Sequence, residues 1–127
     1  MTGPGRIELV CPAGTPAALR AAVDAGADTV YCGFNDETNA RNFPGLNFSR
    51  AEMADSIAYA HRRGAKVMIA VNTLPRAGSP ALWHKAVDDV ASLKADAIIV
   101  ATPIRWGAAV NFPTMGPCAR SRAVPPR

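Results

Sequence analysis

The stretch Ala25-Gly26-Ala27-Asp28-Thr29-Val30-Tyr31-Cys32-Gly33 joins the end of an amphipathic segment to a short apolar run through a glycine turn. Glycine just after a periodic segment is typical of a helix end, and a nearly continuous apolar run is typical of a strand buried between two layers. Related phrases recur around Gly64 and Ala95. The repetition predicts a parallel sheet built from strand and helix units.

The same pattern, followed outward in both directions, gives four strands and three helices. We expect the strands at residues 7–11, 29–33, 66–72 and 97–101. Each helix opens with a recognisable start signal. These signals are Thr15 followed by Pro16, Ser49 followed three residues later by Glu52, and Ser79 followed by Pro80.

The predicted fold class is α/β, the first half of a TIM-like (β/α)8 barrel with four parallel strands and three helices, followed by an irregular tail. An open doubly wound sheet fits the same periodicity. The phosphate-binding pattern GxGxxG is missing after the first strand, where Pro12-Ala13-Gly14 stands instead, and this favours the barrel. Residues 1–101 are expected to form the amino-terminal part of the barrel domain.

Residues 102–127 break every one of these patterns. They contain no Asp, Glu or Lys, and five of the chain's 11 prolines. Ala, Arg, Pro and Gly dominate this tail, as they do when GC-rich DNA is read out of frame. A frameshift or truncation and a disordered basic tail are the two interpretations of this segment.

Composition excludes several classes of function. The formal net charge of +4 resides entirely in residues 102–127, so residues 1–101 are neutral and show no electrostatic footprint for nucleic acid. No apolar stretch is long enough to span a bilayer, and no signal peptide is evident, so we expect no membrane association and a cytoplasmic location. The three cysteines have no CxxC spacing, and no metal site is predicted.

Candidate ligand-binding residues gather in the loop 34–48 and at the end of the third strand, where a barrel places its active face. Asn39, Arg41 and Asn47 lie in this polar loop, and Asn72 ends the strand. The asparagine amides suit either a ligand or their own turns. Arg41 offers a planar fork for a carboxylate or phosphate, or alternatively an ion pair with Asp36 or Glu37 of the same loop. The catalytic residues stay unknown.

Other reactive side chains have simpler interpretations. Cys11 and Cys32 end adjacent strands, but two thiols do not complete a metal site, and packing is the favoured role. His61 and His84 are expected to be surface residues within helices, without a nucleophile or a ligand-spaced glutamate nearby. Asp28 and Asp96 precede strands and belong to the lower face of a barrel, which is concerned with stability.

Five short motifs of the chain together resemble the collagenase-like peptidase family U32, and most closely its ubiquinone-biosynthesis branch. The resemblance covers residues 7–101. The matching strings are Glu8-Leu9-Val10-Cys11-Pro12-Ala13-Gly14, Gly26-Ala27-Asp28-Thr29-Val30-Tyr31-Cys32-Gly33, Thr38-Asn39-Ala40-Arg41-Asn42-Phe43, Gly45-Leu46-Asn47-Phe48 and Val71-Asn72-Thr73. Lys94 stands where the family usually has glycine.

This resemblance implies a TIM-like barrel that pairs with a UbiV-like partner protein and holds a [4Fe-4S] cluster through four cysteines. It also implies oxygen-independent hydroxylation of the ubiquinone ring, with prephenate as the oxygen donor. The cluster cysteines of the family lie beyond the matched region, so we expect neither a cluster nor activity in this chain alone. A peptidase or tRNA-hydroxylation branch of the family, or a non-catalytic interaction fragment, are the alternatives.

Overall fold

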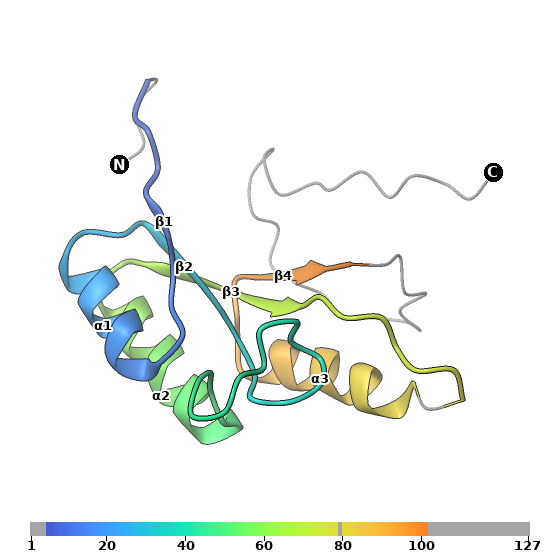
Figure 1. Cartoon of the computed structure of the whole chain (residues 1–127). Helices are drawn as coiled ribbons and strands as arrows, with labels where there is room; N and C mark the ends of the chain where they lie inside the picture. Colours follow the sequence, from blue (N-terminus) through green and yellow to red (C-terminus); the bar gives the residue numbers. More distant parts are fainter. Residues whose placement is uncertain (1–4, 79, 102–127) are drawn as a thin grey trace.

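The computed structural model describes residues 5–78 and 80–101 (Figure 1). Strands and helices alternate as β1 (Val10–Pro12), α1 (Pro16–Asp24), β2 (Thr29–Gly33), α2 (Arg50–Arg62), β3 (Lys66–Val71), α3 (Ala81–Ser92) and β4 (Ala97–Val100). The strands form one sheet in the order β1-β2-β3-β4, with every neighbouring pair parallel. The α/β class with four parallel strands and three helices is therefore confirmed, and the predicted tail at 102–127 lies outside the described residues.

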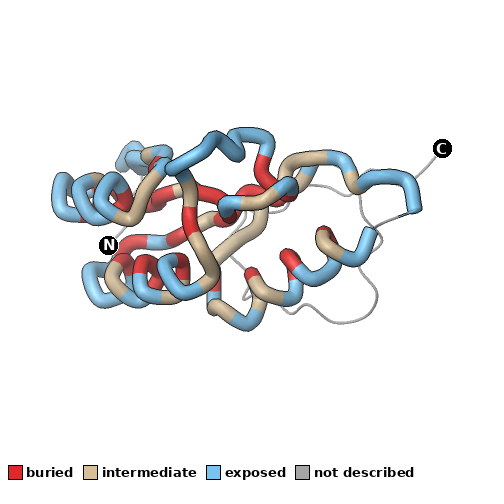
Figure 2. Tube along the Cα trace, turned by 60° about the horizontal axis from the view of Figure 1, so that its bottom comes forward, coloured by how far each residue is buried: buried red, intermediate tan, exposed pale blue. Residues whose placement is uncertain are grey.

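The three helices cover one face of this sheet (Figure 1). Figure 2 shows buried residues along the strands and on the inward helix faces, and exposed residues on the outer faces. Leu19 of α1, Met53 of α2 and Val90 of α3 are fully buried against strand residues such as Val30 and Ile69. Burial of this apolar layer is the main favourable contribution to folding, at about 25 cal/mol per Å² removed from water.

Two of the three predicted helix starts are confirmed in detail. The hydroxyl of Thr15 accepts a hydrogen bond from the backbone of Ala18, with Pro16 in the first turn. Ser49 and Glu52 form the complete capping box. The third start differs, because α3 begins at Ala81 with Pro80 in the cap position and no side-chain cap. Ser79, the predicted cap, lies outside the described residues.

The repeat seen in the sequence corresponds to a repeated turn. Gly26, Gly64 and Lys94 follow the three helices, with φ angles of 101°, 75° and 61°. A positive φ suits glycine and strains most other residues. Lys94 therefore adopts a glycine conformation at the position where the family resemblance implies glycine.

Asp28 and Asp96 fasten the strands at the amino edge of the sheet, as predicted for the lower face. The backbone N–H of Asp28 donates to the carbonyl of Leu9, and its carboxylate accepts from the N–H of Leu9 at 2.8 Å. Asp96 repeats this exchange with Val67, at 2.9 and 2.8 Å. Each aspartate thus holds its own strand to the preceding neighbour in the sheet.

The first strand is shorter at its start than predicted. We expected residues 7–11, but β1 spans Val10–Pro12 and Ile7 is 89% exposed. The reason is the register, since Val10 lies opposite Thr29, the first residue of β2. Residues before Leu9 therefore have no strand to pair with, whereas the N–H of Ala13 still donates to Tyr31. The predicted strand ends at Asn72 and Ala101 are each one residue too long.

Candidate ligand-binding site

The long loop 34–48 leaves the carboxyl end of β2 and returns to it. Phe34 and Phe48 form a parallel bridge at the base of the loop, and both side chains are fully buried. The N–H of Asn35 donates to the carbonyl of Phe48, and the N–H of Phe48 donates to the carbonyl of Gly33. Such closure at the base makes a compact loop whose ends are fixed by the sheet.

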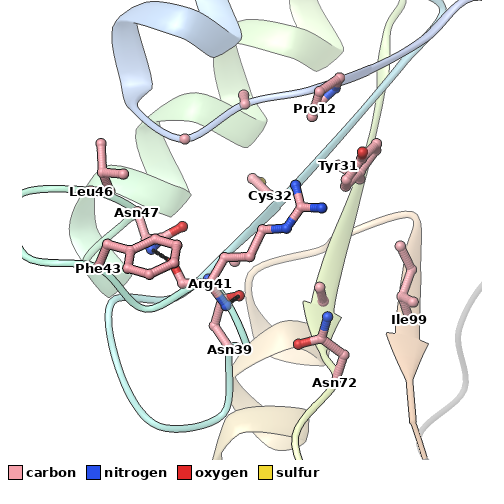
Figure 3. A pocket seen from close by; sticks show the side chains of 14 residues that line it. Pro12, Tyr31, Cys32, Asn39, Arg41, Phe43, Leu46, Asn47, Asn72 and Ile99 are labelled. Atoms are coloured by element: carbon pink, nitrogen blue, oxygen red, sulfur yellow. Dashed lines mark hydrogen bonds between the residues drawn. The ribbon is translucent and has the colours of Figure 1, made fainter.

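A cavity of about 370 Å³ lies between this loop and the carboxyl ends of the strands (Figure 3). Its walls are largely apolar, and all four strand ends or the segments after them contribute. The lining residues are Pro12, Ala13, Gly14, Tyr31, Cys32, Gly33, Asn39, Arg41, Phe43, Leu46, Asn47, Ala70, Asn72 and Ile99. The structure therefore brings the four predicted site residues to one cavity, at the edge where parallel βα sheets bind ligands.

Asn39 is the most buried of these four residues, at 6% exposure. Its Nδ2 donates to the carbonyl of Phe34 at 3.1 Å, and its Oδ1 accepts from the N–H of Arg41 at 3.0 Å. The side chain also packs against Gly33, where there is no space for a Cβ atom. Asn39 therefore shapes the loop and contributes to the cavity wall at the same time.

Asn47 and Asn72 connect the loop to its surroundings. Asn47, with a φ of 72°, donates from Nδ2 to the carbonyl of Arg41 at 2.6 Å. Asn72 accepts the N–H of Ala40 on Oδ1 at 2.9 Å, and its own N–H donates to Thr38 at 3.0 Å. Each amide uses one of its two polar atoms in these bonds. In both residues the turn-stabilising role coexists with a place on the cavity wall.

Among the described residues that line the cavity, Arg41 is the only charged one. Its side chain extends from the loop across the cavity towards Pro12 and Tyr31 (Figure 3). The ion pair considered from the sequence does not form, because Asp36 pairs with Arg50 and Glu37 with Arg76. Within residues 5–78 and 80–101, the guanidinium of Arg41 has no carboxylate within ion-pair distance.

Arg50 was not predicted from the sequence to bear on the site, yet it fastens the loop. Its Nη1 contacts Asp36 at 2.6 Å, its Nε contacts Asp89 of α3 at 3.0 Å, and its guanidinium lies 3.7 Å from the ring centre of Phe34. A signal was present, since Arg50 opens α2 and a cation at a helix N-terminus opposes the helix dipole. A cation at this position indicates that carboxylates from elsewhere in the fold offset its unfavourable interaction with the helix dipole.

Two carboxylates around Arg50 are held in their ionised form. Burial alone would raise the pKa of Asp36, but hydrogen bonds from Thr38 and Arg50 outweigh it and lower this pKa. Burial opposes ionisation of Asp89 as well, and bonds from Lys85 and Arg50 lower its pKa below the ordinary value. The arginine therefore bridges two ionised carboxylates at neutral pH.

The described cysteines do not suit an iron-sulfur cluster. Burial raises the pKa of the Cys32 thiol to about 12, and the thiol donates to the sulfur of Met53 at 3.6 Å. Cys11 lies opposite Val30, two residues before Cys32 along β2. A [4Fe-4S] cluster needs four thiolates. Two thiols, one of them held protonated in the core, do not supply that donor set.

The two histidines and the remaining acids suggest no catalytic pair in the part of the chain that the structure describes. His61 contacts the carboxylate of Asp96 at 2.7 Å, on the amino side of the sheet and away from the cavity, while His84 is exposed. Residues 5–78 and 80–101 contain no group of three or more His, Cys, Asp or Glu residues arranged to hold a metal. No helix among them is long and apolar enough to cross a membrane.

The fold and the cavity together define a parallel βα protein with a candidate ligand site at the carboxyl edge of its strands. Comparison with known families identifies the group, because the model of peptidase family U32 matches residues 14–109. The chain belongs to this family, which confirms the family resemblance in the sequence.

Similar proteins include two that are named for RNA hydroxylation and one that is named as an uncharacterized protease. The chain is 35% identical over 98 residues to tRNA hydroxylation protein P of Helicobacter pylori, covering 77% of this chain and 23% of that protein. It is 34% identical to the 23S rRNA 5-hydroxycytidine synthase of Escherichia coli, covering 75% and 14%. An uncharacterized protease of Methanocaldococcus jannaschii is 35% identical, covering 74% and 23%. The chain thus spans about a quarter or less of each relative.

Proposed function

We propose that this chain provides the donor-binding part of a U32-family hydroxylation protein, with Arg41 as the anchor for a carboxylate. The observation that carries the proposal is that Arg41 is the one charged side chain among the described residues that line a mostly apolar cavity. Arg41 is exposed to solvent, so the support comes from geometry: the planar guanidinium matches a carboxylate with two parallel hydrogen bonds.

The walls of the cavity favour a ligand with a ring. Tyr31 and Phe43 supply aromatic surfaces, and Pro12 and Ile99 supply aliphatic ones. Asn72 uses its Oδ1 on the loop, so its Nδ2 is the amide atom left to donate to a ligand. Prephenate, a small ring compound with two carboxylates, combines these requirements, and it is the oxygen donor that the family resemblance implies.

We further propose that the acceptor is the ubiquinone ring, as in the UbiU-like branch of the family, with a UbiV-like partner protein. Two features support this choice: the neutral charge of residues 1–101, and the loop motif from Asn39 to Phe48. Counterion release from phosphates is the main source of non-specific nucleic-acid affinity, and a neutral surface offers little of it. The iron-sulfur cluster of this branch requires cysteines other than Cys11 and Cys32.

Hydroxylation of RNA is the second candidate acceptor, and the names of the Helicobacter and Escherichia relatives favour it. Peptide hydrolysis is not favoured, because the described residues bring no nucleophile and base together and hold no metal cluster.

Deletion of the gene under anaerobic growth separates these candidates. Mass spectrometry of the quinone pool and of RNA nucleosides from the same cells gives both readouts. We expect loss of ubiquinone with accumulation of an under-hydroxylated precursor, and unchanged hydroxylated nucleosides. The reverse pattern would assign the chain to RNA hydroxylation. Unchanged quinones and nucleosides together would contradict the proposed hydroxylation function.

A further inference from the structure

Arg50 lies outside the cavity, at the junction of the loop 34–48 with α2 and α3. It is the first residue of α2, its Nη1 contacts Asp36 of the loop 34–48, and its Nε contacts Asp89 of α3. Its guanidinium also covers the ring of Phe34, which closes the base of the loop. One side chain therefore fixes the start of the loop relative to two helices.

The contact with Asp36 continues into the loop. While Oδ2 of Asp36 faces Arg50, Oδ1 accepts from the N–H of Thr38 at 2.9 Å and also from its hydroxyl. Thr38 is fully buried, and its carbonyl accepts the N–H of Asn72 at 3.0 Å. The orientation of Asp36 thus fixes the segment that meets the end of β3.

The same segment determines where Arg41 begins. Asn72 accepts the N–H of Ala40, and Asn39 accepts the N–H of Arg41. A hydrogen-bonded series therefore runs from Arg50 through Asp36, Thr38 and Asn72 to the N–H of Ala40. The N–H of Asn39, whose side chain holds Arg41, also donates to the carbonyl of Asp36. Groups joined in one network of this kind show coupled energetics.

We propose that Arg50 is a positioning residue for Arg41, acting through Asp36 and Thr38 to hold the loop so that the guanidinium of Arg41 faces the cavity. The consequence for ligand affinity rests on the proposed function of the cavity. The consequence for the backbone of the loop does not depend on any ligand.

Arg63, the residue that caps the carboxyl end of α2, provides a matched control. It also pairs with an aspartate, Asp24 at 3.2 Å, and also lies over an aromatic ring, that of Tyr59 at 3.9 Å. Arg63 caps the opposite end of α2, remote from the loop. Substitutions Arg50→Met and Arg63→Met therefore remove the same kinds of interaction, and only the first removes them next to the loop.

The test uses the 127-residue chain and its two variants, with hydrogen exchange of the Arg41 amide and affinity for prephenate as readouts. For Arg50→Met we expect at least about tenfold faster exchange at Arg41 and about tenfold weaker prephenate binding. Arg63→Met is expected to match the wild-type chain in both. Arg50→Lys, which keeps the charge but cannot bridge two carboxylates as a fork, is expected to fall between.

Two results would overturn the inference. Exchange at Arg41 that is equal in Arg50→Met and Arg63→Met would show that the loop does not depend on Arg50. Faster exchange with unchanged prephenate affinity would reduce Arg50 to a stabilising role. If Arg50→Met fails to fold, Arg50→Lys and Asp89→Asn carry the comparison. A wild-type chain that does not bind prephenate contradicts the proposed function, and exchange at Arg41 then decides the positioning role alone.

Discussion

Gly33 and Asn39 are packed so closely that a Cβ atom on Gly33 would overlap the side-chain amide of Asn39. The glycine ends β2 and the asparagine lies six residues further along, inside the loop. Because the amide of Asn39 bonds both Phe34 and Arg41, this contact links the end of the sheet to the cavity.

Substitution Gly33→Ala is therefore expected to expel Asn39 and break both of its hydrogen bonds. We expect a loss of about 1–3 kcal/mol in the free energy of unfolding, measured by urea denaturation. Gly14→Ala is the control, since a Cβ there meets nothing within 4 Å and should change stability little. Equal stability of the two variants would show that Asn39 can move at no cost.

Replacement of Lys94 by glycine is expected to stabilise the chain. Its φ of 61° is one that glycine adopts freely, as Gly26 and Gly64 do after the other helices. Lys94→Gly is expected to raise the free energy of unfolding by about 1 kcal/mol, measured as a higher midpoint in thermal unfolding. Gly64→Ala, at a φ of 75°, should lower it by a similar amount. A lower midpoint for Lys94→Gly would contradict the assigned turn.

Removal of the Asp96 carboxylate should loosen the amino edge of the sheet. Asp96→Ala leaves the N–H of Val67 without its side-chain acceptor and frees His61. An unfolding free energy lower by about 1–3 kcal/mol is expected. Asp88→Ala, at an exposed position of α3, serves as the control and should stay within about 0.5 kcal/mol of the wild-type chain. Similar losses in both variants would mean that the edge contact is unimportant.

The carboxylates around Arg50 predict acid sensitivity. The pKa values of Asp36 and Asp89 are lowered in the folded chain, so their contribution to stability is present above their unfolded pKa of about 3.9. It is lost as the pH falls below that value towards the folded pKa. The stability difference between the wild-type chain and Asp36→Asn, from urea unfolding at several pH values, should shrink between about pH 5 and pH 2. A constant difference would contradict the ion pair.

Much of the fold could be predicted from the sequence because local signals agreed with tertiary packing. The capping box at Ser49 and the glycine after α2 depend on backbone geometry within a few residues, and both were found where expected. The predicted start of β1 at Ile7 was wrong because the start of a strand depends on where its partner strand begins. The first residue of β2, Thr29, lies opposite Val10, and nothing in the apolar character of Ile7 indicates this register. The periodicity of a sequence shows where apolar side chains lie, whereas a strand forms only where a neighbouring strand supplies backbone hydrogen bonds.

The residues of the candidate site could also be predicted only in part. Asn39, Arg41, Asn47 and Asn72 could be named because polar residues after strands fall at one edge of a parallel sheet. Their hydrogen-bond partners could not, since Asn72 reaches Ala40 and Arg50 reaches Asp89 across 32 and 39 residues of chain. Tertiary packing decides which carboxylate pairs with which arginine. Because Asp36 pairs with Arg50 and Glu37 with Arg76, the guanidinium of Arg41 can face the cavity.

Calorimetric titration of prephenate into the 127-residue chain, its Arg41→Met variant and its Arg76→Met variant tests the central claim most directly. Arg76 is a matched arginine whose pair with Glu37 lies on the exposed side of the loop. We expect saturable binding by the wild-type chain and by Arg76→Met, and at least about tenfold weaker binding by Arg41→Met with an unchanged free energy of unfolding. Equal affinity for all three chains, or no binding by the wild-type chain, would contradict the assignment of Arg41 as the carboxylate anchor.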